Sequence, residues 1–195
     1  MLYGATMFDN KYQEKKHDHN RIVNELIAEI NYLLSEDVKF RGLVIRVSKV
    51  SEKDILTTEN KWEVDPKRKV SWSWRQIVVK KKKKIRRICL SFNCNDILCG
   101  MLFCSASRHG LNVNVRYLEG NPDAMHPLKT YIMDIALLSV DTYAEKINAT
   151  TIMIQEPLPD VINKYINRGF HLNQSDTRRL NKGGVPLYKT LEKKL

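Results

Sequence analysis

The stretch from Leu111 to Phe170 constrains the fold most, because strand and helix patterns alternate along it. Alternating and β-branched residues indicate strands, whereas apolar side chains at three- and four-residue steps indicate helices. In order, the segments are a strand at 112–119 (NVNVRYLE), a helix at 127–147, a short apolar strand at 150–155 (TTIMIQ) and a helix at 159–167 that is closed by Gly169. Two parallel strands joined by a helix have one favoured hand, and such units bind ligands at the carboxyl ends of their strands.

The flanking segments predict a mixed α/β fold whose sheet is mostly antiparallel. Ser51 and Asp54 form a capping-box pattern at the start of a short helix that reaches about Glu59. Residues 93–96 tolerate left-handed backbone geometry and therefore predict a hairpin turn. The other predicted elements are helices at 19–35 and 72–83, strands at 43–50, 85–92, 97–105 and 185–191, a weak strand after Phe170 and a polar loop at 173–184. Residues 1–16 are mixed and polar, and we expect them to be poorly tied down.

Length and composition favour one domain with its own core. At 195 residues the chain is large enough to need no disulfide or metal staple. No run of about 18 apolar residues is present, so the sequence predicts no membrane span. The first residues lack the apolar segment of a secretion signal, which favours a cytoplasmic location.

The four cysteines predict buried, reduced thiols on strands. They are Cys89, Cys94, Cys99 and Cys104, at a regular spacing of five. This is not a C-x-x-C metal pattern, so the sequence predicts no metal site. Free cysteine is among the most buried residue types, and no thiol is placed as an obvious nucleophile.

The formal net charge of +11 is concentrated in one stretch. Between Pro66 and Asn95 there are eleven bases and no acid, and they include the run Lys80, Lys81, Lys82, Lys83 and Lys84. Such a patch favours an anionic partner, such as a nucleotide, a nucleic acid or a phosphorylated cofactor. A solvated helix end that keeps the protein soluble remains the other interpretation of the same pattern.

Three pieces of the sequence are similar to one known family. They are a helix ending in DTYA (141–144) before the strand TIMI (151–154), the Y-x-x-x-G-F ending of NKYINRGF (163–170), and a last strand PLYKTL (186–191). Together they resemble the GNAT superfamily of acetyl-CoA-dependent acyltransferases. The resemblance covers about residues 43–191. It implies a GNAT-like mixed sheet with a β-α-β crossover at 43–195, and residues 1–42 as an N-terminal extension with one helix.

The resemblance implies that acetyl-CoA binds at the start of the helix at 127–147. A helix N-terminus with free amides is an anion site suited to the pyrophosphate. The implied binding residues are Leu128, Lys129, Thr130, Tyr131, Ile132 and Met133. The sequence departs from the family here, because Tyr131 and Met133 occupy the positions of two glycines and Leu128 that of an Arg or Gln. The family's asparagine before the motif tyrosine is Leu158.

The resemblance also implies the catalytic residues. Tyr165 occupies the position that often protonates the leaving thiolate, and Glu119 at the end of its strand would accept the proton of the amine. His126 is a further titratable group beside the loop. Trp72 and Trp74 lie where acceptor substrates usually bind, although core packing suits at least one of them.

We therefore expect an N-acetyltransferase that transfers acetyl from acetyl-CoA directly to a primary amine in a ternary complex. The sequence does not decide whether the acceptor is a small molecule, a peptide or a polyanion such as RNA. It also does not decide whether the protein is a homodimer. The alternative is a GNAT-fold binding protein that has lost catalysis and whose basic face binds nucleic acid or a protein partner.

Overall fold

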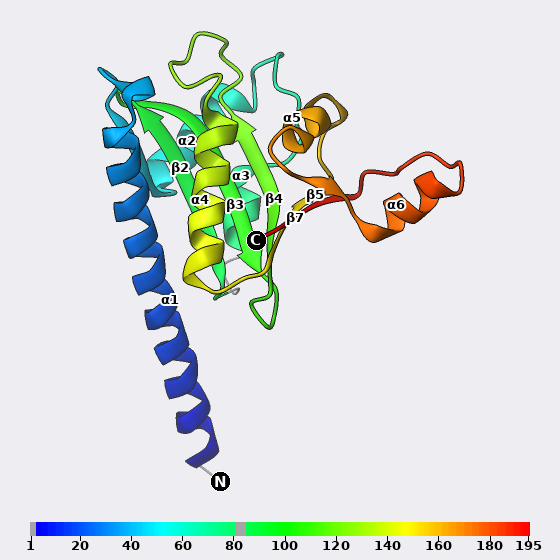
Figure 1. Cartoon of the computed structure of the whole chain (residues 1–195). Coiled ribbons are helices and arrows are strands. Elements are labelled where there is room, and N and C mark those ends of the chain that lie inside the picture. The colour runs from blue at the N-terminus through cyan, green and yellow to red at the C-terminus, as the bar shows by residue number, and fades with distance from the viewer. Residues whose placement is uncertain (1–2, 81–84) are drawn as a thin grey trace.

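The computed structural model describes residues 3–80 and 85–195, and its centre is one seven-stranded sheet (Figure 1). The strands are β1 (Ile45–Lys49), β2 (Arg87–Cys94), β3 (Ile97–Ala106), β4 (Asn112–Gly120), β5 (Thr151–Gln155), β6 (His171–Leu172) and β7 (Thr190–Lys194). Their order is β1-β2-β3-β4-β5-β7-β6. Only β4 and β5 pair in parallel among the described strands. This confirms the mixed, mostly antiparallel sheet with one crossover.

Helices cover both faces of this sheet (Figure 1). They are α1 (Tyr3–Glu36), α2 (Glu52–Thr57), α3 (Trp74–Lys80), α4 (Ile132–Lys146), α5 (Ile162–Ile166) and α6 (Gln174–Asn181), with short 3₁₀ or π turns at Val38–Phe40, Thr58–Trp62 and Pro159–Val161. None of the described helices is both long and apolar enough to cross a membrane.

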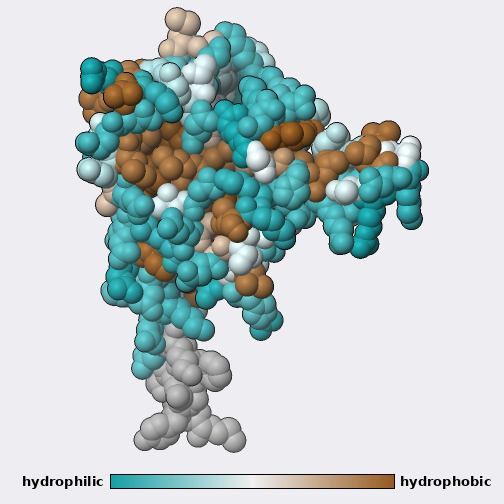
Figure 2. All heavy atoms as spheres, viewed as in Figure 1, coloured by the Kyte–Doolittle hydropathy of each residue, from teal (hydrophilic) through white to brown (hydrophobic). Residues whose placement is uncertain are grey.

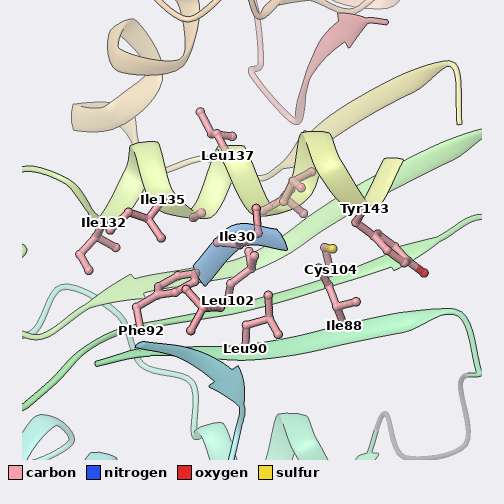
Figure 3. Close-up of a cluster of buried hydrophobic side chains, with 14 of the residues drawn as sticks. Ile30, Ile88, Leu90, Phe92, Leu102, Cys104, Ile132, Ile135, Leu137 and Tyr143 are labelled. Carbon is pink, nitrogen blue, oxygen red and sulfur yellow. The ribbon is translucent and has the colours of Figure 1, made fainter. Parts of the chain in front are cut away.

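The main core lies between the sheet and the pair α1 and α4. Ile30 of α1, Ile135 of α4 and Leu102 of β3 meet in it (Figure 3), and none is more than 1% exposed. A second cluster packs α2 and α3 on the opposite face, around Trp62 and Trp74. Because the N-terminal helix contributes to the main core, it belongs to the same packed unit as the sheet.

Two local predictions are confirmed by backbone geometry. Asn95 and Asp96 have φ angles of 48° and 63° between the paired residues Cys94 and Ile97, as a two-residue hairpin loop with both central residues left-handed requires. The capping box at the start of α2 is complete, because the Ser51 hydroxyl accepts from the Asp54 amide at 3.2 Å and Asp54 accepts from the Ser51 amide at 2.8 Å.

Several predicted boundaries were wrong. α1 begins at Tyr3 rather than at 19, since the sequence before His19 has no apolar stripe to mark a helix, and residues 12–18 are exposed. α4 begins at Ile132 rather than at 127, because the preceding residues form turns. The polar loop contains α6, whose N-cap Asn173 accepts from the Asp176 amide at 2.9 Å. β7 starts only at Thr190, since Tyr188 has a φ of 52° that interrupts a strand.

Candidate active site

The two parallel strands separate at their carboxyl ends. β5 pairs with β4 only from Asn112 to Val115, while β4 continues to Gly120 along β3. A bulge lies at this point: Val115 faces Cys104 and Tyr117 faces Phe103, so Arg116 is an extra residue on β4. Bulges bend the bulged strand and end pairing, often beside active sites. The bulge therefore opens the sheet where the sequence predicted a ligand.

A cavity of about 630 Å³ fills this opening and reaches both faces of the sheet. From the α4 face it is lined by Lys129, Thr130, Ile132, Met133, Lys164, Tyr165 and Arg168, and from the opposite face by Trp72 and Tyr117. Two molecules could thus approach one another through the gap between β4 and β5, each from its own face.

The lining of this cavity is strongly cationic. Arg116, Lys129, Lys164 and Arg168 line it, against one acidic side chain, Glu156. Arg168 is fixed in place, because its Nε donates to Asp134 Oδ1 at 2.7 Å and its Nη1 donates to the Lys164 carbonyl at 2.9 Å. The charge distribution suits a ligand that carries several negative charges.

The start of α4 offers backbone donors to the same cavity. Among the described residues, no backbone acceptor is found for the amides of Thr130, Met133 and Asp134. Such free amides, together with the helix dipole, favour an anion. Of the six residues predicted to bind the cofactor, four line the cavity, whereas Leu128 is fully buried in the core and Tyr131 packs edge-on against Phe40 at 5.1 Å.

Tyr165 lies in the cavity wall where α5 faces the gap. Its ring packs edge-on against Phe170 at 5.7 Å, and its side chain is only 4% exposed. Burial raises the pKa of Tyr165 to about 12, although the nearby Arg168 acts in the opposite direction. The phenol therefore holds its proton at neutral pH and is available as a hydrogen-bond donor in the cavity wall.

Glu119 lies beside the cavity rather than in its lining. Its Oε1 accepts from Arg68 Nε at 2.7 Å, and its Oε2 accepts from Arg68 Nη2 at 3.0 Å and from Trp74 Nε1 at 2.7 Å. Both carboxylate oxygens are thus engaged. This arrangement fixes the segment before α3 against β4.

The two tryptophans have different positions. Trp74 is fully buried in the second cluster and does not line the cavity. Trp72 lines the cavity and packs edge-on against Tyr117 at 5.2 Å, and its Nε1 is buried without a hydrogen-bond partner. Trp72 is therefore the one of the pair that can contact a ligand.

Glu156 is the functional candidate that the sequence did not reveal. It follows the last residue of β5, lines the cavity, and has a left-handed φ of 49°. Its amide donates to the Lys189 carbonyl at 2.9 Å. Left-handed geometry in a residue other than glycine costs free energy and is concentrated at functional sites. Only the predicted end of β5 could have indicated its place.

The remaining candidates lie away from the cavity. His126 is 5% exposed, burial lowers its pKa, and its Nδ1 has no partner. All four thiols are unpaired, three of them buried and Cys89 half-buried, which confirms that prediction. Lys80 ends α3 on the surface, while Lys81, Lys82, Lys83 and Lys84 lie outside the described residues.

Comparison with known proteins gives similarity at the level of structure alone. No protein-family model and no curated protein matches the sequence. The chain is similar to the PaiA N-acetyltransferase of Thermoplasma acidophilum in complex with coenzyme A, at 15% identity and a TM-score of 0.53 over 77% of this chain and 99% of that one. An acetyltransferase of Thermus thermophilus gives 12% identity and a TM-score of 0.54 over 77% of this chain and 97% of that one.

A third solved structure matches over part of its length. N-acetylglutamate synthase from Neisseria gonorrhoeae, complexed with coenzyme A and N-acetyl-glutamate, has 13% identity and a TM-score of 0.55 over 77% of this chain and 35% of that chain.

Proposed function

We propose that this chain, which has the fold of the GNAT acetyltransferases, is an acetyl-CoA-dependent N-acetyltransferase that acts on a primary amine. The observation that carries the proposal is the cationic cavity between the separated ends of β4 and β5. It is open to the start of α4 on one face and to Trp72 on the other. A thioester from the first face and an amine from the second would meet in the gap.

The phosphates of the cofactor would bind at the start of α4. The amides of Thr130 and Met133 are available there, and Lys129, Lys164 and Arg168 supply positive charge. A coenzyme A molecule is bound in the solved structures of two similar proteins, which supports coenzyme A as the ligand. The side chains of Ile132 and Met133 replace close backbone approach with apolar contact to the cofactor.

The transfer itself needs one proton donor. The amine nitrogen attacks the thioester carbonyl, the C–S bond breaks, and the thiolate leaves as coenzyme A. Tyr165 is the group in the cavity wall that would donate its hydrogen bond to the sulfur as the C–S bond breaks and supply the proton that the thiolate takes up. Proximity of the two substrates supplies much of the remaining rate acceleration.

The attacking nitrogen must also lose a proton. Glu119 was the predicted acceptor, and that role would require its carboxylate to exchange Arg68 and Trp74 for the substrate. Glu156 already lines the cavity, and no hydrogen bond to its carboxylate is found among the described residues. We therefore assign to Glu156 the role of accepting the proton of the substrate ammonium group. Glu119 instead holds Arg68 and Trp74 in place.

Calorimetric titration with acetyl-CoA tests the proposal first. We expect binding, and a rise in the unfolding temperature through mass action. A Lys129→Ala, Arg168→Ala variant should bind more weakly, whereas Lys182→Ala, Lys189→Ala, with the same loss of charge on the α6 side, should bind like the parent. Release of free coenzyme A thiol with a panel of amines then tests transfer. Absence of cofactor binding would contradict the proposal, and binding without transfer would favour the alternative of a GNAT-fold binding protein.

A further inference from the structure

A second cavity, of about 230 Å³, lies between α1, the edge strand β1, its neighbour β2, and α3. It shares no lining residue with the cavity between β4 and β5. His19 forms part of its wall: its Nε2 lies 2.8 Å from the Arg87 carbonyl, and its ring packs edge-on against Tyr143 at 5.9 Å. These contacts hold α1 against β2 and fix the width of the cavity.

The charge of this second cavity is uncompensated. Lys16, Lys49 and Arg87 line it, and no Asp or Glu is among its described lining residues. None of the three makes an ion pair within residues 3–80 and 85–195. Arg87 is half-buried, and burial lowers its pKa. Within the part of the chain that the structure describes, its Nη1 donates to the Val78 carbonyl at 3.3 Å and to no other acceptor. A partly buried cation without a counter-charge favours an anion from outside the chain.

An aromatic ring stands beside these cations. Tyr12, Lys16 and Asn20 follow one another at four-residue steps, so they share the face of α1 that lines the cavity. Tyr12 is 41% exposed, so its ring is accessible from solvent. The N-terminal part of α1 extends beyond the sheet (Figure 1). On the face drawn in Figure 2, the described atoms of that part are mainly hydrophilic.

We propose that this second cavity is a binding site for single-stranded nucleic acid. Proteins that bind single strands combine a positively charged groove along the phosphates with aromatic side chains on which bases stack. Lys16, Lys49 and Arg87 would contact the phosphates, and Tyr12 would stack on a base at the rim. The site is separate from the proposed acetyltransferase site and does not depend on it.

Fluorescence anisotropy with a labelled single-stranded RNA, measured on the full chain across a salt series, tests the site. We compare Lys16→Gln, Lys49→Gln with Lys182→Gln, Lys189→Gln, which removes the same charge near α6, on the other side of the molecule from α1 (Figure 1). Each lost phosphate contact lowers the slope of log K against log salt by about 0.7, so the first variant should lose about 1.4 and the control none. All four lysines are exposed, and circular dichroism verifies that both variants fold.

Tyr12→Leu gives an independent arm, because it keeps the charge and removes the ring. It should weaken RNA binding at least about fivefold at constant salt slope, as loss of one stacked base implies. Equal losses in the two lysine variants, or no RNA binding by the parent, would overturn the proposal. Calorimetric titration with inorganic pyrophosphate gives a further outcome. If pyrophosphate binds and the binding is lost in Lys16→Gln, Lys49→Gln, while the salt slope of RNA binding is unchanged in that variant, the cavity binds a small anion instead of RNA. Binding of acetyl-CoA should be unchanged in every variant of this cavity.

Discussion

Arg68 and Glu119 form a buried two-point ion pair beside the active-site cavity. Their side chains are 8% and 6% exposed, and two nitrogen–oxygen distances of 2.7 and 3.0 Å join them. The Arg68 Nη2 also donates to the Trp72 carbonyl at 2.7 Å. The pair thus connects β4 with the segment that carries Trp72, the residue that faces the acceptor side of the cavity.

Removing one partner of this pair should destabilise the fold strongly. Arg68→Ala leaves a buried carboxylate without its counter-charge, which costs about 3–5 kcal/mol of unfolding free energy. Lys69 is the neighbour of Arg68 and forms an exposed ion pair with Asp160. Lys69→Ala removes that pair and should lower the free energy of unfolding by at most about 1 kcal/mol. Urea unfolding monitored by tryptophan fluorescence measures the free energy of unfolding of both variants. Equal losses of stability in the two variants would contradict the prediction that the buried pair matters more than the exposed one.

Tyr165→Phe should reduce turnover and leave cofactor binding unchanged. Loss of a general acid lowers kcat by about 100-fold or more, whereas the ring that lines the cavity is retained. Tyr143→Phe is the matched control, since that tyrosine is buried, has a hydroxyl without a partner and does not line the cavity. Steady-state kinetics with acetyl-CoA separates kcat from KM. Unchanged turnover in the Tyr165 variant would remove it as the proton donor.

Glu156→Gln and Glu119→Gln distinguish the two candidate proton acceptors. We expect Glu156→Gln to lower kcat/KM for the amine by about 100-fold, with stability unchanged. Glu119→Gln should mainly lower stability, because its oxygens hold Arg68 and Trp74. The assignment fails if Glu119→Gln loses turnover at unchanged stability while Glu156→Gln keeps the turnover of the parent.

Gly100 of β3 lies directly beneath the start of α4. A Cβ there would approach Ile132 Cδ1 to 2.8 Å and Phe92 Cδ2 to 3.1 Å. Gly100→Ala should therefore cost about 1–3 kcal/mol of stability and displace the residue that begins α4, which weakens acetyl-CoA binding. Adding Ile132→Val removes the clashing methyl group and should restore part of both. No recovery in the double variant would indicate a different cause.

Stability should fall on the acidic side of neutrality. Burial lowers the pKa of both His19 and His126, so between those lowered values and the ordinary value of 6.5 the unfolded chain binds more protons than the folded one. The free energy of unfolding therefore decreases as pH drops below about 6.5. Chemical unfolding across pH 5 to 8 measures the slope. His126→Gln should flatten it and His17→Gln, at an exposed position, should not.

The crossover and the hairpins could be predicted because local patterns decide them. The hydrophobic period of residues 112–155 defines two strands and a helix, and residues 93–96 allow only a tight turn. The motif around Tyr165 predicted a site residue, and the Tyr165 side chain lines the cavity. These features depend on residues close together in the sequence.

The rest depends on contacts between distant residues, which one sequence does not reveal. The ion pair of Arg68 with Glu119 joins positions 51 residues apart, and together with the Trp74 hydrogen bond it holds the Glu119 carboxylate outside the cavity lining. The place of Leu128 in the core and the left-handed backbone of Glu156 likewise follow from tertiary packing. The extent of α1 was missed since the sequence before His19 carries no hydrophobic period.

The packing of α1 against α4 has a consequence for how the chain folds. Val23, Leu26 and Ile30 lie on one face of α1, but the helix that packs against this face begins only at Ile132. Contacts so distant in sequence form late and carry a large loop-closure cost. Until α4 packs against the sheet, part of the apolar face of α1 therefore stays uncovered, and aggregation competes with folding.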